Sequence, residues 1–172
     1  MKRLRRTVQG RSDGGATAVE FALVVPILLV LVFGIIDYGL WFSDSLSSRQ
    51  GVREAARQGV VENFGTSSSC GLNGASGDAN SLALMCTAQD RIGGIAGDPS
   101  IMVSAPEGWV RGKPLLVCSQ MKAGAGTGLV PLPNDRIIRT EVQMAIEQAS
   151  PGIAFGGGRE APPAGANWDW CG

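Results

Sequence analysis

The residues Gly15, Ala16 and Glu20 have the types and spacing of a processing site followed by a charge-pairing site. Glycine before a scissile bond suits a protease that takes the backbone close in, because glycine has no Cβ to clash. Cleavage after Gly15 would make Ala16 the new N-terminus and Glu20 the fifth residue. The ammonium group of Ala16, in the same or a neighbouring subunit, would then pair with the Glu20 carboxylate at the edge of an apolar segment. We therefore expect Gly15 and Ala16 to form a cleavage site and Glu20 to set the register between subunits.

Two alternatives to this interpretation stay open. Glu20 could simply lie at a membrane interface and extend its carboxylate toward water, with the two glycines as a flexible joint. A cut after Gly14 is a second alternative, because Gly14 also precedes the apolar segment.

Residues for conventional catalysis are scarce. The chain contains no histidine, which excludes Ser-His-Asp triads and most zinc hydrolase sites. The stretch 119–122 has the S-x-x-K spacing, but neither S-D-N nor K-T-G follows, and the glycines of 124–128 lack the ending of a P-loop. Residues 16–172 carry ten basic against fourteen acidic side chains, so nothing favours nucleic acid. We expect no enzyme activity, no cofactor, no metal and no nucleic-acid partner.

A long apolar segment must position the cleavage site. The uncharged run 21–36 covers about 24 Å as a helix, and its continuation to Phe42 brings this to about 33 Å, enough to cross a bilayer. Five basic residues precede the run, and Asp37 and Asp44 follow it, so the positive-inside rule places the N-terminus in the cytoplasm. We expect a cytoplasmic leader at 1–15 and a transmembrane helix at 16–42, loosened near its middle by Pro26.

The helix is expected to continue as a stalk over residues 43–64, which contain no proline. Four small residues in this segment would allow the helix of another subunit to approach closely: Gly51, Ala55, Ala56 and Gly59. Arg49, Arg53 and Arg57 form one stripe, for which a solvated helix face is the simplest interpretation.

The part of the chain after the stalk, residues 65–172, contains all four cysteines: Cys70, Cys86, Cys118 and Cys171. In an exported domain they indicate two disulfides, and their wide spacings do not match a structural zinc site. Three pairings are possible. We favour Cys70 with Cys86, because a short helix capped by Asp78 or Asn80 would carry Cys86 on its buried face, and this leaves Cys118 with Cys171.

Three segments of this domain are strand candidates: 101–105, 115–119 and 138–147. The last alternates most clearly, with Ile138, Thr140 and Val142 on one face, although a helix would also bring Ile138 and Val142 together. Trp168 and Trp170 indicate that the glycine- and proline-rich tail docks back on the domain. The expected fold class is α+β: a long N-terminal helix, then a small disulfide-bonded domain with a short helix and about three antiparallel strands.

Three motifs resemble those of the TadE-like pseudopilins of tight-adherence (Tad/Flp) pilus systems. They are the junction and apolar run of 15–26, the Phe33–Gly39 stretch and the V-R-E-A-A-R sequence of 52–57, and the resemblance extends over about residues 14–60, a third of the chain. The second motif has Asp37 where glutamate is usual. The related TadF and TadG proteins share much of the same N-terminal signal.

The resemblance implies a minor pilin that a prepilin peptidase, an aspartic protease of the cytoplasmic membrane, processes after Gly15. The expected partners are this peptidase, other pilins and pseudopilins, the inner-membrane assembly platform and membrane lipid. The expected location is the cytoplasmic membrane, with a single pass and the domain outside the cytoplasm, and possible incorporation into a type IV-like pilus that serves cell adhesion. The alternative is a membrane-anchored binding module for a surface or cell-wall ligand.

Overall fold

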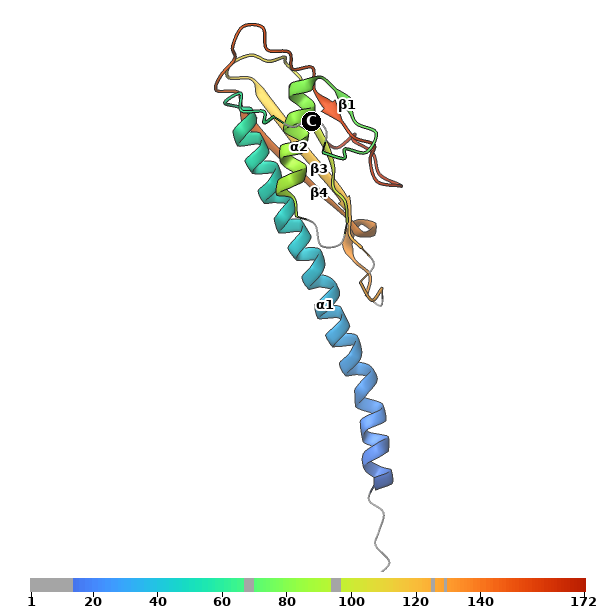
Figure 1. Cartoon of the computed structure of the whole chain (residues 1–172). Helices are drawn as coiled ribbons and strands as arrows, with labels where there is room; N and C mark the ends of the chain where they lie inside the picture. Colours follow the sequence, from blue (N-terminus) through green and yellow to red (C-terminus); the bar gives the residue numbers. More distant parts are fainter. Residues whose placement is uncertain (1–13, 67–69, 94–96, 125, 129) are drawn as a thin grey trace, which may run out of the picture.

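The computed structural model describes residues 14–66, 70–93, 97–124, 126–128 and 130–172, so the first thirteen residues of the expected leader at 1–15 lie outside the described residues. One helix, α1 (Gly14–Gly59), extends far beyond a domain in which a sheet carries α1 and a second helix, α2 (Ala79–Arg91), on one face (Figure 1). The strands are β1 (Ser76–Gly77), β2 (Ser100–Ser104), β3 (Pro114–Lys122), β4 (Ile137–Ala145) and β5 (Gly158–Arg159), with a short helix, η1 (Pro133–Arg136), before β4. The fold is α+β, as the sequence predicts.

The sheet has the order β1-β5-β2-β3-β4, and every neighbouring pair is antiparallel. β3 is the central long strand, with Val117 opposite Val103 on β2 and Val142 on β4. The strand predictions at 101–105, 115–119 and 138–147 are confirmed, and the helical alternative for the last segment is wrong. The two-residue strands β1 and β5 were not predicted, because a pair of residues shows no alternation.

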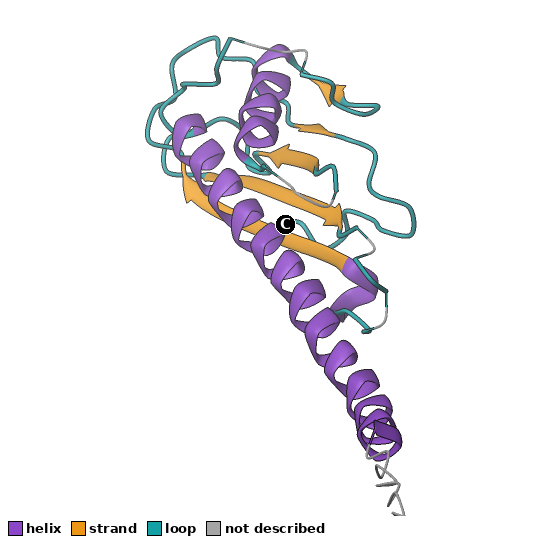
Figure 2. Ribbon diagram, turned by 60° about the horizontal axis from the view of Figure 1, so that its bottom comes forward, coloured by secondary structure: helices purple, strands orange, loops and turns teal. Residues whose placement is uncertain are grey.

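β3 is buried on both faces, and its two sets of side chains have different neighbours. Leu115, Val117 and Met121 belong to the core formed with α1 and α2. Figure 2 shows α1 lying across the face of the two long strands β3 and β4. The opposite set, which includes Cys118, lies under the C-terminal tail, and a disulfide from Cys118 to Cys171 holds this tail on the sheet. Both faces of one strand are therefore shielded from water in a domain that has few large apolar residues.

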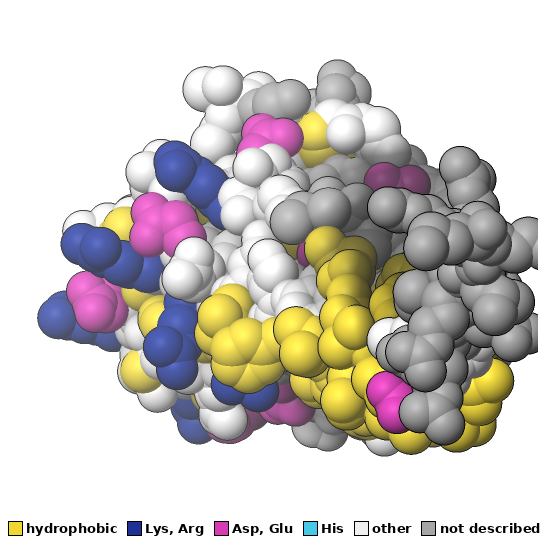
Figure 3. Space-filling view, turned by 90° about the horizontal axis from the view of Figure 1, so that it is seen from below, with side chains coloured by type: hydrophobic (Ala, Val, Ile, Leu, Met, Phe, Trp, Pro, Cys, Tyr) yellow, Lys and Arg dark blue, Asp and Glu magenta, His cyan; other side chains and the backbone are white. Residues whose placement is uncertain are grey.

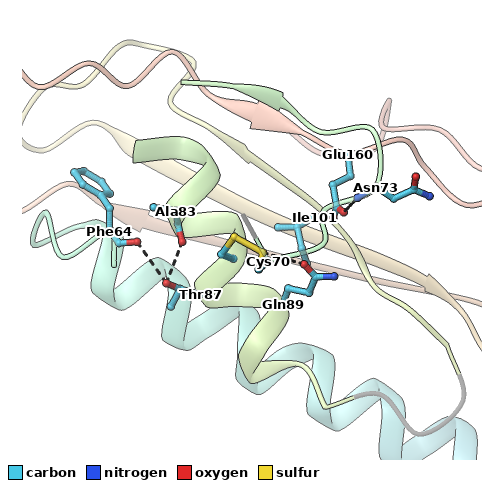
Figure 4. Close-up of a disulfide and its surroundings, with 9 residues drawn as sticks. Phe64, Cys70, Asn73, Ala83, Thr87, Gln89, Ile101 and Glu160 are labelled. Carbon is cyan, nitrogen blue, oxygen red and sulfur yellow. Dashed lines mark hydrogen bonds between the residues drawn. A yellow bond between two sulfur atoms is a disulfide. The ribbon is translucent and has the colours of Figure 1, made fainter. Parts of the chain in front are cut away.

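The second disulfide joins Cys70 to Cys86 on α2, so both favoured pairings are confirmed. Asp78 is the N-cap of α2, and its carboxylate accepts hydrogen bonds from the backbone amides of Asn80 and Ser81 at 3.1 and 3.0 Å. On the next turns the hydroxyl of Thr87 lies within hydrogen-bond distance of the carbonyl oxygens of Ala83, in α2, and of Phe64, and the contact with Phe64 ties α2 to the segment that follows α1 (Figure 4).

Glu160 ties the C-terminal tail to the middle of the domain. Its buried carboxylate accepts hydrogen bonds from the backbone amides of Asn73 and Ile101, at 2.8 and 2.6 Å (Figure 4). The indole of Trp168 donates to the carbonyl oxygen of Glu160 at 2.9 Å, and Trp170 lies under the guanidinium of Arg139. The expected docking of the two tryptophans is therefore present.

The segment expected to be a free stalk forms part of the domain core. Val52, Ala55, Ala56, Val60 and Phe64 are all buried in one cluster with side chains of α2 and β3. After Gly59 the chain turns at Glu62, which has a left-handed φ of 59°. The arginine stripe is exposed, as a solvated helix face requires.

Candidate functional site

The N-terminal half of α1 is an apolar helix that the rest of the described chain leaves uncovered. Most of its large side chains from Val19 to Ile36 are exposed, among them Phe21 at 70 %, Ile27 at 66 % and Ile35 at 73 %. The segment from Gly15 to Ile36 measures about 33 Å, which matches the hydrocarbon core of a bilayer. Among the described residues α1 is the one helix long and apolar enough to cross a membrane. This surface is suited to lipid or to other apolar helices, and it provides single-pass membrane anchoring.

Gly15 and Ala16 lie in the first turn of α1. A Cβ built on Gly15 would meet no atom within 4 Å, so no neighbour within the described chain restricts this position to glycine. The first backbone amides of a helix have no intrahelical acceptor, which makes this turn the easiest part of α1 to unwind. The expected cleavage bond is therefore in an accessible place, although the enzyme would have to extend a helical turn.

Glu20 is exposed on the uncovered helix, beside Val19 and Phe21. Within the described residues, no lysine or arginine lies within salt-bridge distance of its carboxylate. Six positions later α1 passes through Pro26 without a break, although the proline supplies no backbone donor there. The structure thus presents Glu20 at the surface of the apolar helix.

The four small residues expected at a contact between subunits pack within the chain instead. Ala55 and Ala56 are fully buried. A Cβ on Gly51 would come within 2.3 Å of the Ile92 side chain, and one on Gly59 within 2.8 Å of both Leu84 and Leu115. These positions are small because α2 and β3 of the same chain approach α1 closely. Their space is filled, so a second subunit has no access to it.

Where the apolar segment of α1 ends, the helix contacts the connection between β3 and β4. The buried carboxylate of Asp37 accepts hydrogen bonds from the amide and the hydroxyl of Thr127, at 2.8 and 2.7 Å. Arg136 adds a favourable charge interaction with Asp37. One residue further along the helix, the hydroxyl of Tyr38 donates to the carbonyl oxygen of Pro131 at 3.2 Å. We name this set of contacts the helix junction.

A polar seam continues from the helix junction into the domain. Asp44 and Ser48 are fully buried on the inner side of α1. The hydroxyl of Ser48 lies 2.6 Å from that of Ser119 on β3 and 2.9 Å from that of Thr140 on β4. These bonds hold the distal half of α1 against both long strands. The seam was not predicted, although Asp44 and Ser48 are four residues apart, as two side chains on one face of a helix are.

Seen from the end at which α1 protrudes, hydrophobic side chains gather in a continuous patch, with Lys and Arg side chains beside it (Figure 3). The hydrophobic patch continues along the outer side of α1 above the helix junction, where Tyr38, Phe42 and Leu46 are 44 %, 59 % and 43 % exposed. Arg49, Arg53 and Arg57 continue this side further from the apolar segment. The outer side of α1, from Phe42 to Arg57, is therefore a second helix surface that the described chain leaves exposed, in addition to the apolar half of α1.

The described residues contain no group of three or more His, Cys, Asp or Glu side chains that could hold a metal ion.

Comparison with known families agrees with the position of these surfaces. The model of the family described as TadE-like protein matches residues 15–57, which is nearly the whole of α1. No curated protein and no solved structure matches the chain. The family match begins at the predicted cleavage site and ends two residues before the end of α1, so the similarity to TadE-like proteins covers this helix and not the domain that follows it.

Proposed function

We propose that the chain is a TadE-like minor pilin, or pseudopilin, that acts in the assembly or priming of a Tad/Flp-type pilus. The observation that carries this proposal is the uncovered apolar half of α1, which continues into a domain with two disulfides. Such a helix is stable in a bilayer and also offers a ready surface for the apolar helices of other pilins. The polar seam supports the proposal, because a rigid joint transmits the position of the membrane helix to the domain.

In this proposal a prepilin peptidase removes the cytoplasmic leader after Gly15, and the subunit waits in the cytoplasmic membrane with its domain outside the cytoplasm. The two disulfides fit such an oxidising location. The role is assembly and not catalysis, with other pilins and the inner-membrane platform as partners. The free outer side of α1, with Phe42 and Leu46, is the surface through which we expect subunits to meet.

Processing gives the direct test. The variant Gly15→Leu places a large side chain next to the scissile bond and should keep the leader attached, because the peptidase must take this backbone close in. Mass spectrometry of the protein purified from cells with an active prepilin peptidase measures the result. Gly14→Ala is the matched control and should still yield a chain that starts at Ala16.

A native protein that still starts at Met1 in these cells would overturn the processing step. A chain that starts at Gly15 would instead move the cut to the bond after Gly14.

A further inference from the structure

The connection between β3 and β4 reaches the level of the apolar segment. A Cβ on Gly34 would lie 3.4 Å from the side chain of Val130, so Val130 is directly beside this position of α1. Gly34 precedes Ile36, the end of the uncharged run, by about 3 Å along the helix axis. In Figure 1 this connection is the part of the domain that extends furthest down α1. A bilayer that covers the apolar run must therefore come into contact with the connection.

The side chains of the connection suit this position. The sequence from Ala123 to Pro133 carries no charged residue. Pro131 is exposed, and Val130 and Leu132 are half-buried. Charged residues appear only where the connection joins the strands: Lys122, Asp135 and Arg136, which line an open hollow of about 340 Å³ beside Pro131 and Leu132. An apolar tip with charged flanks matches the boundary between acyl chains and headgroups.

Aromatic residues of α1 lie at the same level. Tyr38 and Phe42 are exposed, and Trp41 is half-buried. Tyrosine and tryptophan side chains concentrate at the two interfaces of a membrane, where an apolar ring and a polar edge are both accommodated. They place the surface of the bilayer near the helix junction and not higher on the domain.

Asp37 explains why the connection is held there. This carboxylate follows the apolar run directly, and a charge at the edge of hydrocarbon is costly unless it is paired or hydrogen-bonded. Thr127 supplies two donors to it, and Arg136 supplies a charge. Gly126 makes room, because a Cβ at this position would lie 2.1 Å from a carboxylate oxygen of Asp37. The connection thus covers Asp37 on the side where lipid begins.

We propose that the β3–β4 connection is a membrane-contacting element, in which Val130, Pro131 and Leu132 lie in the phospholipid interface of the leaflet from which α1 emerges. The connection would fix the depth of the domain at the membrane while it shields Asp37 from the hydrocarbon. This inference rests on membrane anchoring by α1 and not on the proposed role in pilus assembly.

Nitroxide labelling of the full chain in vesicles tests the proposal. All four native cysteines are in disulfides, so a label attaches selectively to one introduced cysteine in the variants Pro131→Cys, Ile35→Cys and Val110→Cys. The vesicles contain phosphatidylcholine and phosphatidylglycerol. Collision with dissolved oxygen, which concentrates in lipid, is compared with collision with a water-soluble nickel chelate. We expect the label at position 131 to be protected from the chelate like that at 35, and the label at 110, 51 % exposed in the native side chain, to remain accessible.

Equal accessibility to the chelate at positions 131 and 110, with position 35 protected, would overturn the proposal. Loss of protection at 35 would also overturn it, because α1 itself would then not span the vesicle membrane. Addition of Gly126→Val to the labelled Pro131→Cys chain should release the connection from Asp37 and expose the label to the chelate. An unchanged depth would contradict the role of Asp37 in holding it.

Discussion

The carboxylate of Asp37 on α1 accepts two hydrogen bonds from Thr127, which lies 90 positions later in the chain. This contact closes the domain on the helix at the point where the apolar segment ends. It also shows that the boundary between membrane helix and domain is a packed junction and not a free stalk. The sheet, α2 and the distal half of α1 are therefore packed into one domain that begins where the apolar segment ends.

Substitution of Thr127 tests how much the helix junction contributes to the stability of the protein. Thr127→Val removes a hydrogen bond to a buried carboxylate, and the expected loss in the free energy of unfolding is about 1.5–3 kcal/mol. Thr127→Ser keeps the hydroxyl and is expected to lose much less. Denaturant unfolding in detergent micelles, followed by tryptophan fluorescence, measures both variants. Equal losses for Val and Ser would mean that the hydroxyl contributes little.

Enlarging a small residue of α1 should lower the stability of the domain and not weaken a contact between subunits. Ala55 is fully buried within its own chain, so Ala55→Leu should overpack the core and lower the free energy of unfolding by about 1–3 kcal/mol. Arg53→Leu changes the exposed side of the same helix and should stay within about 0.5 kcal/mol of the native protein. Unfolding curves of the two variants decide the point. An Ala55→Leu chain that is as stable as the native protein but no longer associates with other subunits would instead favour the sequence-based expectation of a contact between subunits.

Glu160 predicts a dependence of stability on pH. Burial raises the pKa of this carboxyl above its ordinary value of 4.5, against the opposing effect of the amides of Asn73 and Ile101. A raised pKa in the folded state means that the contribution of Glu160 to stability is complete below about 4.5 and is lost as the pH rises through the folded-state value. The variant Glu160→Gln has no group that titrates at this position. It should lower the free energy of unfolding by the same amount at every pH, because its amide has only one oxygen to accept hydrogen bonds. Unfolding measured upward from pH 4.5 should therefore show the native protein losing stability relative to the variant, and a constant difference would contradict this prediction.

Much of the fold could be predicted because its signals are local. The alternation of Ile138, Thr140 and Val142 marks a strand with one buried face, and the cap at Asp78 marks the start of α2. The disulfide pairing followed from the placement of Cys86 on that helix. β1 and β5 escaped prediction, because they pair through backbone atoms over only two residues each.

The contacts of the α1 surfaces were harder to predict, because small residues on a helix show that something packs closely against it but not whether that element belongs to the same chain or to another subunit. Gly51 and Gly59 give the same pattern whether the partner is α2 of the same chain or a helix of another subunit. The helix junction was missed for a related reason. Asp37 is an acid after an apolar run, and its partner Thr127 lies in a glycine-rich stretch with no periodicity to align the two.

Glu20 provides the test of assembly itself, and this prediction depends on the proposed function. Glu20→Gln should leave cleavage after Gly15 intact, since the side chain lies beyond the scissile bond, but it should impair pilus formation, because the Ala16 ammonium of a neighbouring subunit loses its counter-charge at the edge of the hydrocarbon. Glu20→Asp keeps the charge on a shorter side chain and should retain part of the activity. Mass spectrometry reports the processing and electron microscopy of the cells reports the pili. Normal pili in Glu20→Gln cells would show that Glu20 does not set the register, and that it lies at the membrane interface without a partner in the assembly.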